Sequence, residues 1–271
     1  MKRTSKATNS HGSALITGAS SGIGEALAQR FAAAGFDLVI VARNQAKLQV
    51  LSKQMADQHG ISVKVVSADL AQPGAATRLH SELARQKCPV NVLVNCAGVL
   101  EQGLFTAIDA PSHQQIIDLN ISGLTAMLHA FLPGMVTRGQ GRVLNVASVA
   151  AFQPVPSLAS YAASKAYVLS LSESLAEELR GTGVTVTALC PGITATAMLA
   201  QAAGSNGKLG ELPDFLVGDA GQVADNGFAA CMRGDAICVP GMVNSVAMVA
   251  SRATPKWLVR RLGGLLGRKA M

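Results

Sequence analysis

The stretch that decides the fold is "TGASSGIG", at residues 17–24. It follows the apolar run "ALIT" (14–17) and opens an Ala-rich segment with the composition of a helix. A glycine-rich turn between a strand and a helix leaves backbone N–H groups and the positive end of the helix free to approach a phosphate. The spacing therefore predicts phosphate binding at Gly18, Gly22 and Gly24, and the alternative is a tight turn that holds no ligand.

The pattern around this turn repeats along the chain, because short apolar runs alternate with longer helical ones. The predicted strands are 14–17, 37–42, 63–68, 90–95, 142–148, 184–190 and 236–240, and the predicted helices include 45–58, 75–87, 112–138 and 221–233. Near-continuous apolar strands, each followed by a helix, indicate a parallel sheet covered on both faces. We expect an α/β, doubly wound sheet of about seven strands, with ligands beyond the carboxyl ends of the strands.

Length and composition favour one domain. The 271 residues are 49% hydrophobic and 14% charged, and no linker or repeat divides them. We expect a basic, disordered tail at 1–12, one domain at 13–250 and a basic amphipathic extension at 251–271. The formal net charge of +7 comes from these two ends, so the body is slightly acidic. A nucleic-acid surface would place its cations on the folded body, which argues against that partner.

The basic segment "TPKWLVRRLGGLLGRKAM" (254–271) gathers Trp257 and several leucines on one helical face. Such a helix packs on its own domain or on a neighbouring subunit, or lies on an anionic membrane surface.

The start of the chain lacks the apolar run of a signal peptide. The five cysteines form no CxxC pair and no zinc-ligand spacing with histidine, so no metal is expected. We expect a cytoplasmic protein, with weak peripheral membrane contact as an alternative for the tail.

The residue after the second strand selects the dinucleotide. An acidic residue there would bind the ribose 2′-OH of NAD, whereas this chain has Arg43 in "VARN". A guanidinium can donate two hydrogen bonds to a phosphate, so the sequence predicts NADP(H) over NAD(H). The alternative is an exposed arginine at a helix start.

Tyr161 and Lys165 stand four residues apart in "YAASK" (161–165), about one helical turn. Taken alone, such a pair is an ordinary feature of a helix surface. The other motifs of the chain change this interpretation. Together with this pair they occur in the order "TGASSGIG" (17–24), "ADL" (68–70), "NCAG" (95–98), "LNISG" (119–123), "NVAS" (145–148), "YAASK" (161–165) and "PGITATAM" (191–198).

With these motifs, residues 13–245 resemble the short-chain dehydrogenase/reductases, and within them the NADP(H)-preferring, bacterial-type reductases. The resemblance implies a Rossmann-type fold and a homo-oligomer, a dimer or a tetramer. It implies a catalytic tetrad of Asn120, Ser148, Tyr161 and Lys165. One departure is Cys96, which replaces the second asparagine of the usual "NNAG".

The resemblance also assigns the cofactor contacts. Asp69 and Leu70 would hold the adenine, Asn95, Ala97 and Gly98 would line its ribose and the sheet edge, and Thr194 and Thr196 would reach the carboxamide. The full set of expected cofactor residues is Gly18, Ser20, Ser21, Gly22, Ile23, Gly24, Arg43, Asp69, Leu70, Asn95, Ala97, Gly98, Tyr161, Lys165, Pro191, Gly192, Thr194 and Thr196.

Hydride transfer to a carbonyl builds negative charge on its oxygen. Tyr161 would protonate that oxygen as a general acid, and Ser148 would hydrogen-bond it. Since a free phenol has a pKa of about 10, we expect the Lys165 ammonium, together with the positive nicotinamide ring, to stabilise the phenolate and so lower the pKa of Tyr161. In the family the lysine also anchors the nicotinamide ribose, and Asn120 would hold a water that relays protons.

The segments expected to flank the carbonyl are 99–105, 149–159 and 195–217. They supply mainly apolar side chains: Val99, Leu100, Leu104, Phe105, Phe152, Val155, Leu158, Met198, Leu199, Phe215 and Leu216. No arginine there is placed to bind a carboxylate. We therefore expect a largely hydrophobic ketone or aldehyde, or oxidation of the matching secondary alcohol. The alternatives are a dehydrogenase of a small polar hydroxy acid or amino acid, and a catalytically silent dinucleotide-binding regulator.

Overall fold

The computed structural model describes residues 12–194 and 218–241. The expected tail at 1–12, apart from its last residue, and the expected extension at 251–271 lie outside these residues. The strands are β1 (Ser13–Thr17), β2 (Asp37–Ala42), β3 (Val63–Ser67), β4 (Val92–Asn95), β5 (Gly141–Val146), β6 (Val184–Leu189) and β7 (Ile237–Cys238). The helices are α1 (Gly22–Ala33), α2 (Gln45–His59), α3 (Ala75–Arg85), α4 (Ala110–Ile116), η1 (Ile117–Gly123), α5 (Leu124–Thr137), η2 (Val149–Phe152), α6 (Ala159–Glu178) and α8 (Ala220–Arg233).

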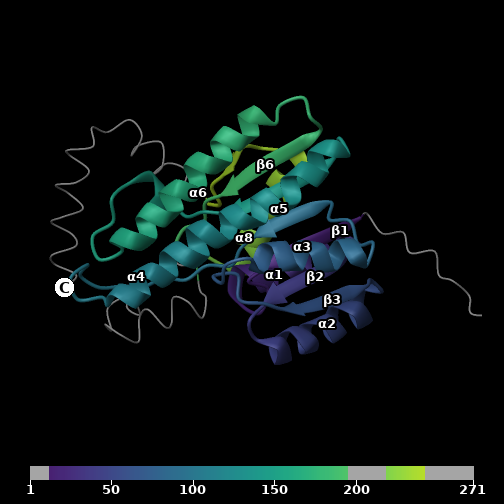
Figure 1. The fold of residues 1–271 in the computed structure, drawn as a ribbon, viewed down its shortest axis with the longest axis horizontal. Coiled ribbons are helices and arrows are strands. Elements are labelled where there is room, and N and C mark those ends of the chain that lie inside the picture. Colours follow the sequence, from purple (N-terminus) through teal and green to yellow (C-terminus); the bar gives the residue numbers. More distant parts are fainter. Residues whose placement is uncertain (1–11, 195–217, 242–271) are drawn as a thin grey trace, which may run out of the picture.

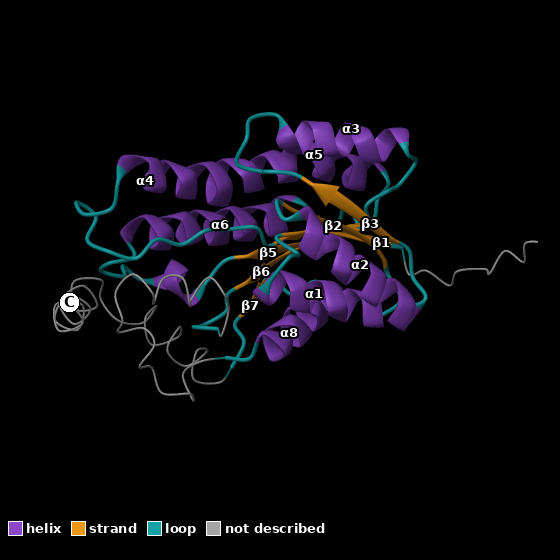
Figure 2. Cartoon of the chain, turned by 90° about the horizontal axis from the view of Figure 1, so that it is seen from below, coloured by secondary structure: helices purple, strands orange, loops and turns teal. Residues whose placement is uncertain are grey.

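The strands form one parallel sheet in the order β3-β2-β1-β4-β5-β6-β7. Helices α3, α5 and α6 cover one face, while α1, α2 and α8 cover the other (Figures 1 and 2). This arrangement confirms the doubly wound α/β sheet of seven strands. Since all strands run the same way, their carboxyl ends meet at one edge, and the sequence motifs follow those ends.

Alternation along the strands builds two separate cores. Leu15 of β1 packs into the core beneath α3, α5 and α6. Its neighbours Ala14 and Ile16 pack into the core shared with α1, α2 and α8. Both sets are fully buried, because successive side chains of a strand point to opposite faces and both faces are covered.

The helix expected at 112–138 is interrupted. Residues Ile117–Gly123 form a π-helical segment between α4 and α5. A Cβ on Gly123 would lie 2.6 Å from the Leu70 carbonyl oxygen, so only glycine allows this close approach to the loop after β3. π-helical turns inside α-helices are often found at functional sites, and this one contains Asn120.

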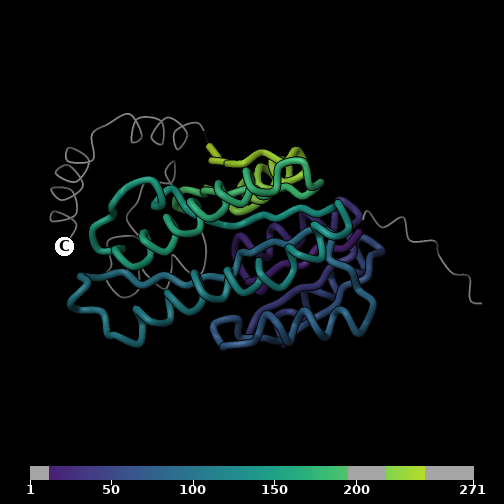
Figure 3. The backbone as a smooth tube through the Cα atoms, turned by 45° about the horizontal axis from the view of Figure 1, so that its top comes forward, coloured from purple at the N-terminus to yellow at the C-terminus, as the bar shows by residue number. Residues whose placement is uncertain are grey.

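The run Ala110–Thr137 is long and apolar enough to cross a membrane by length and composition. Its residues Leu124, Met127, Leu128 and Phe131 are part of the core beneath α3 and the sheet. Figure 3 shows this teal run lying beside the green helix α6. These contacts are those of a core helix in a globular fold.

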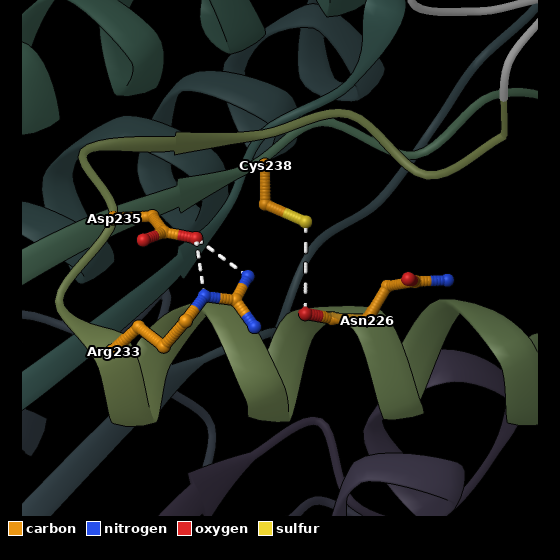
Figure 4. A network of polar contacts seen from close by, with 4 residues as sticks. All are labelled: Asn226, Arg233, Asp235 and Cys238. Atoms are coloured by element: carbon orange, nitrogen blue, oxygen red, sulfur yellow. Dashed lines mark hydrogen bonds and ion pairs between the residues drawn. The ribbon is translucent and has the colours of Figure 1, made fainter.

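The last strand is shorter than expected, since β7 contains two residues where the sequence predicted 236–240. In the turn between α8 and β7 the Arg233 guanidinium pairs with Asp235 at 2.6 Å, and the Cys238 thiol of β7 donates to the Asn226 carbonyl of α8 at 3.6 Å (Figure 4). The ion pair is exposed, so we expect it to contribute little to stability. The short helix η2 was not predicted.

Candidate active site

The glycine turn after β1 has the backbone that the sequence predicted. Gly18 and Gly22 have φ angles of +68° and +57°, values that side chains disfavour. A Cβ on Gly18 would lie 2.9 Å from the Ala97 backbone. Ser21 caps α1 without a side-chain hydrogen bond, so the N–H groups of the first turn keep their capacity to bind an anion. These features fit a pyrophosphate.

Gly24 allows the turn to close on the helix, because a Cβ there would lie 2.2 Å from the Gly18 carbonyl oxygen. The Gly24→Ala variant must displace the turn. We expect a stability loss of about 1–3 kcal/mol, together with weaker dinucleotide binding. Thermal denaturation and a titration of NADPH fluorescence measure both effects. Gly134→Ala in α5 is the matched control, since its Cβ would meet only the flexible end of Arg138. A Gly24→Ala protein as stable as this control would contradict the assignment.

Thr17 joins the ends of β1 and β4, and sequence reasoning missed it. Its Oγ1 accepts hydrogen bonds from the backbone N–H groups of Cys96 and Ala97, at 2.9 and 3.0 Å. It also donates to the Val94 carbonyl at 3.3 Å. The side chain therefore fixes the "NCAG" backbone against the glycine turn. The sequence signal that could have identified Thr17 was its position as a lone polar residue at the end of an apolar strand.

Arg43 lies directly after β2 and is exposed. Ser67 donates a hydrogen bond to its carbonyl at 3.1 Å, and Asn44 caps α2 through the Lys47 N–H. Within residues 12–194 and 218–241, the Arg43 guanidinium has neither an ion pair nor a hydrogen bond. The arginine therefore stands at the expected edge of the sheet, and its donors have no partner among the described residues. Asp69 follows β3, and its carboxylate accepts from the Ala71 N–H at 3.1 Å.

Asn95 begins a chain of side-chain hydrogen bonds beneath the site. Its amide donates to Asn145 at 2.9 Å, and Asn145 donates to Ser172 at 2.9 Å, which joins β4, β5 and α6. Asn95 is buried, and its Oδ1 has no hydrogen-bond partner among the residues that the structure describes. The side chain thus lies inside the sheet, and its expected contact with a ribose stays a prediction.

Asn120 is 1% exposed and binds the loop after β4. Its Oδ1 accepts from the Val99 N–H at 2.9 Å, and its Nδ2 donates to the Val99 carbonyl at 3.0 Å and to Ser164 at 3.1 Å. A Cβ on Gly98 would lie 3.2 Å from Asn120 Oδ1 and 3.6 Å from Lys165 Nζ. The ends of the Asn120 and Lys165 side chains therefore both lie next to Gly98. The side chain of Asn120 therefore joins this loop to α6, and its expected water contact stays a prediction.

Ser148, Tyr161 and Lys165 converge at the end of β5. Ser148 begins η2 and accepts from the Ala150 N–H at 3.1 Å. Tyr161 and Lys165 lie in the first two turns of α6, with Lys165 Nζ 5.7 Å from the centre of the Tyr161 ring. Burial raises the pKa of Tyr161, and a hydrogen bond with Ser148 opposes this shift. The structure thus brings together the expected serine, tyrosine and lysine.

The electrostatics differ from the expectation that Lys165 lowers the pKa of Tyr161. Lys165 is 6% exposed and donates to the Val146 carbonyl at 2.8 Å. Burial lowers the pKa of its ammonium from 10.5 to about 8. At Tyr161 the burial that raises the pKa therefore outweighs the hydrogen bond with Ser148 that lowers it. Near neutral pH Tyr161 holds its proton, as a general acid requires. Burial also raises the pKa of the Cys96 thiol to about 11, so this thiol is neutral there.

The segment after β6 closes the site. Pro191 accepts from the Val149 N–H at 3.0 Å, which ties this segment to η2. Thr194 is buried, and its hydroxyl donates to the Gly192 carbonyl at 3.1 Å. Thr196 and the apolar residues expected at 195–217 lie outside the described residues. Of the remaining apolar set, Leu104 and Phe105 are the most exposed.

A parallel sheet with a glycine turn after β1, and with Ser148, Tyr161 and Lys165 after β5, defines a dinucleotide-binding fold with an acid–base site. The sequence profile of the short chain dehydrogenases matches residues 13–206. The chain belongs to the short-chain dehydrogenase/reductase family, whose enzymes use NAD(P)(H).

Three known proteins illustrate the similarity. The human inactive hydroxysteroid dehydrogenase-like protein 1 is 35% identical over 189 residues, which make up 69% of this chain and 57% of that protein. This chain therefore matches little more than half the length of that relative. A short-chain dehydrogenase from Sphingobium yanoikuyae in complex with NADPH is 32% identical, with a TM-score of 0.79 over 89% of this chain and 93% of that one. A bulky-bulky ketone specific alcohol dehydrogenase from Comamonas testosteroni is 29% identical, with a TM-score of 0.76 over 89% and 92%.

Proposed function

We propose that this protein is an NADP(H)-dependent oxidoreductase that reduces a largely hydrophobic ketone or aldehyde, or oxidises the matching secondary alcohol. The observation that carries the proposal is the convergence of Ser148, Tyr161 and Lys165 at the carboxyl end of β5, with only β4 between this strand and the β1 strand that the glycine turn follows. An acid, a hydrogen-bond donor and a buried cation at the place where a dinucleotide meets its substrate suit carbonyl reduction.

The bound dinucleotide would supply the hydride, and the side chains of this chain would manage the charge on the carbonyl oxygen. The hydroxyls of Ser148 and Tyr161 would both hydrogen-bond this oxygen, and Tyr161 would pass its proton to it. Burial favours the neutral phenol, so the acid is ready at neutral pH. Lys165, held by the Val146 carbonyl, would stabilise the phenolate that remains.

The free guanidinium of Arg43 supports NADP(H) as the cofactor. In Arg43→Ala we expect the Kd for NADPH to rise about tenfold to a hundredfold, since charge-assisted hydrogen bonds contribute about 1.5–3 kcal/mol. The Kd for NADH should stay within about twofold, because NADH lacks the 2′-phosphate. Fluorescence titrations of both cofactors measure the change. Lys53→Ala, at an exposed cation within α2, is the control. An unchanged ratio of the two affinities in Arg43→Ala would contradict the assignment of Arg43 to the 2′-phosphate of NADP(H).

The apolar side chains near the site support a hydrophobic substrate. Leu104 and Phe105 are exposed, and the Comamonas testosteroni neighbour is named for bulky ketones. The alternative substrate, a small polar hydroxy acid or amino acid, needs a cation to bind its carboxylate. Within the described part of the chain, the 99–105 and 149–159 segments contain no lysine or arginine.

The second candidate function is a catalytically silent dinucleotide-binding regulator. The observation that favours it is the human relative, which is called inactive. This chain keeps Asn120, Ser148, Tyr161 and Lys165, and we therefore prefer the enzyme. Turnover separates the two functions, since a regulator would bind NADPH and reduce no carbonyl.

The assembly and location of the protein are part of the same proposal. We propose a homo-oligomer in the cytoplasm, with the 251–271 segment packed on protein or in weak contact with anionic lipid. Light scattering of the full chain measures the subunit number. Sedimentation with anionic vesicles, with and without residues 254–271, tests the lipid contact.

A further inference from the structure

His113 of α4 joins two segments at the start of the catalytic helix α6. Its Nε2 lies 3.0 Å from the Phe105 carbonyl oxygen, and its Nδ1 lies 2.8 Å from the Ser160 hydroxyl. The imidazole also stacks on the Phe105 ring, with centroids 4.3 Å apart and planes inclined by 28°. Ser160 directly precedes Tyr161. One side chain therefore couples the loop after β4 to the helix that carries the general acid.

We propose that His113 is a positioning residue: it holds the 99–108 loop so that Leu104 and Phe105 form an apolar wall for the larger substituent of the carbonyl substrate. This inference rests on the proposed function and adds to it a determinant of substrate size. His113 does not touch the reacting atoms. It acts through the loop, whose apolar side chains would contact the substrate.

The two hydrogen bonds of His113 define the proton on its ring. A carbonyl oxygen can only accept, so Nε2 must carry a hydrogen and donate it to Phe105. In the neutral ring Nδ1 is then the acceptor for the Ser160 hydroxyl. Both ring nitrogens are used, and the stacked Phe105 ring adds a third contact. The imidazole thus holds the loop backbone and the Phe105 side chain together.

Other contacts tie the same loop to the site. The Gly103 N–H donates to the Ser157 carbonyl at 2.9 Å, which joins the 99–108 loop to the segment that leads into α6. Ser157 has a φ of +65°, a conformation that side chains disfavour, so the surrounding structure must hold it in place. Asp109 caps α4 through the Ser112 N–H at 2.7 Å and fixes the helix from which His113 projects.

The contacts that fix the loop leave its largest apolar side chains facing outward. Leu104 is 51% exposed and Phe105 is 61% exposed. Both lie on the loop that His113 and Ser157 hold against the start of α6. A rigid pair of exposed apolar side chains beside an acid–base site suits the binding of an apolar group better than it suits stability alone.

The experiment compares His113→Ala with His113→Gln on a bulky aryl ketone and on 2-butanone, with NADPH as reductant. In His113→Ala we expect the KM for the aryl ketone to rise about tenfold, with kcat and the KM for 2-butanone changed by about twofold or less. His113→Gln can still donate to the Phe105 carbonyl, and we expect it to keep most of the preference for the aryl ketone. His129→Ala, at an exposed histidine of α5, is the control.

Hydrogen exchange of the 99–108 amides gives a readout that needs no turnover. We expect faster exchange in His113→Ala than in the wild type, His113→Gln or His129→Ala, since the loop loses its tie to α6. Unchanged exchange would overturn the positioning role. An equal loss on both ketones, or no change on either, would overturn the role in substrate size. Failure of the wild type to reduce either ketone counts against the proposed function instead, and the exchange result then still decides whether His113 positions the loop.

Discussion

Replacing Tyr161 with phenylalanine is expected to lower kcat for carbonyl reduction by about a thousandfold or more, because the substrate oxygen loses its proton donor. The change removes one oxygen atom and keeps the ring that Lys165 Nζ approaches. NADPH affinity should therefore change by about threefold or less. Steady-state rates, with an NADPH titration by fluorescence, measure both quantities.

The chain supplies a matched control in its other tyrosine. Tyr167 lies on the same helix, is partly exposed, and shares a hydrogen bond of 2.9 Å with Thr125. Tyr167→Phe removes the same atom far from the reacting groups, and we expect nearly wild-type rates. Equal activity of the two variants would show that Tyr161 is not the acid.

Replacing Lys165 with methionine has the second largest expected effect. We expect kcat to fall by about a hundredfold or more, because the phenolate left by Tyr161 loses its nearest cation. The same variant is expected to be more stable than the wild type near neutral pH, because it removes a buried ammonium. Lowering the pKa of this lysine from 10.5 to about 8 on folding means that the protonated group destabilises the folded state by about 3 kcal/mol.

This cost disappears as the ammonium loses its proton. Between pH 8 and 10.5 the unfolded chain binds more protons at Lys165 than the folded chain does, so stability rises with pH. Relative to Lys165→Met, the wild type should therefore gain stability across this window, and below pH 8 the difference should be constant. Urea denaturation of the two proteins from pH 7 to pH 10 measures the difference. A difference that does not change with pH would show that Lys165 is not held in a water-excluded site.

The sequence predicted the sheet well because its strands are buried on both faces. Runs such as those of β1, β2 and β6 are mainly apolar, so they can be recognised as strands from local sequence. Gly18, Gly22 and Gly24 were also predictable from local sequence. Gly18 and Gly22 have the positive φ angles of a tight turn, and Gly24 lies against the nearby Gly18 carbonyl.

Features that depend on tertiary contacts could not be predicted. The π-helical segment around Asn120 depends on the approach of Gly123 to the Leu70 carbonyl, which lies far away in the sequence. The sign of the pKa shift at Tyr161 depends on burial, whereas the i, i+4 spacing indicated only the charge of Lys165. His113 carried no sequence signal, because its partners come from a loop and from another helix.

The central claim is hydride transfer from NADPH to an apolar carbonyl, and isotope transfer tests it most directly. The wild type is incubated with NADPH deuterated at nicotinamide C4, in both stereochemical forms, and with ketones graded from 2-butanone to bulky aryl ketones. Mass spectrometry then measures deuterium at the carbinol carbon of each alcohol. One deuterium per alcohol from one form of the cofactor, absent with Tyr161→Phe, is the predicted result. Tight NADPH binding with no deuterated alcohol from any ketone would contradict the proposal and favour a dinucleotide-binding regulator.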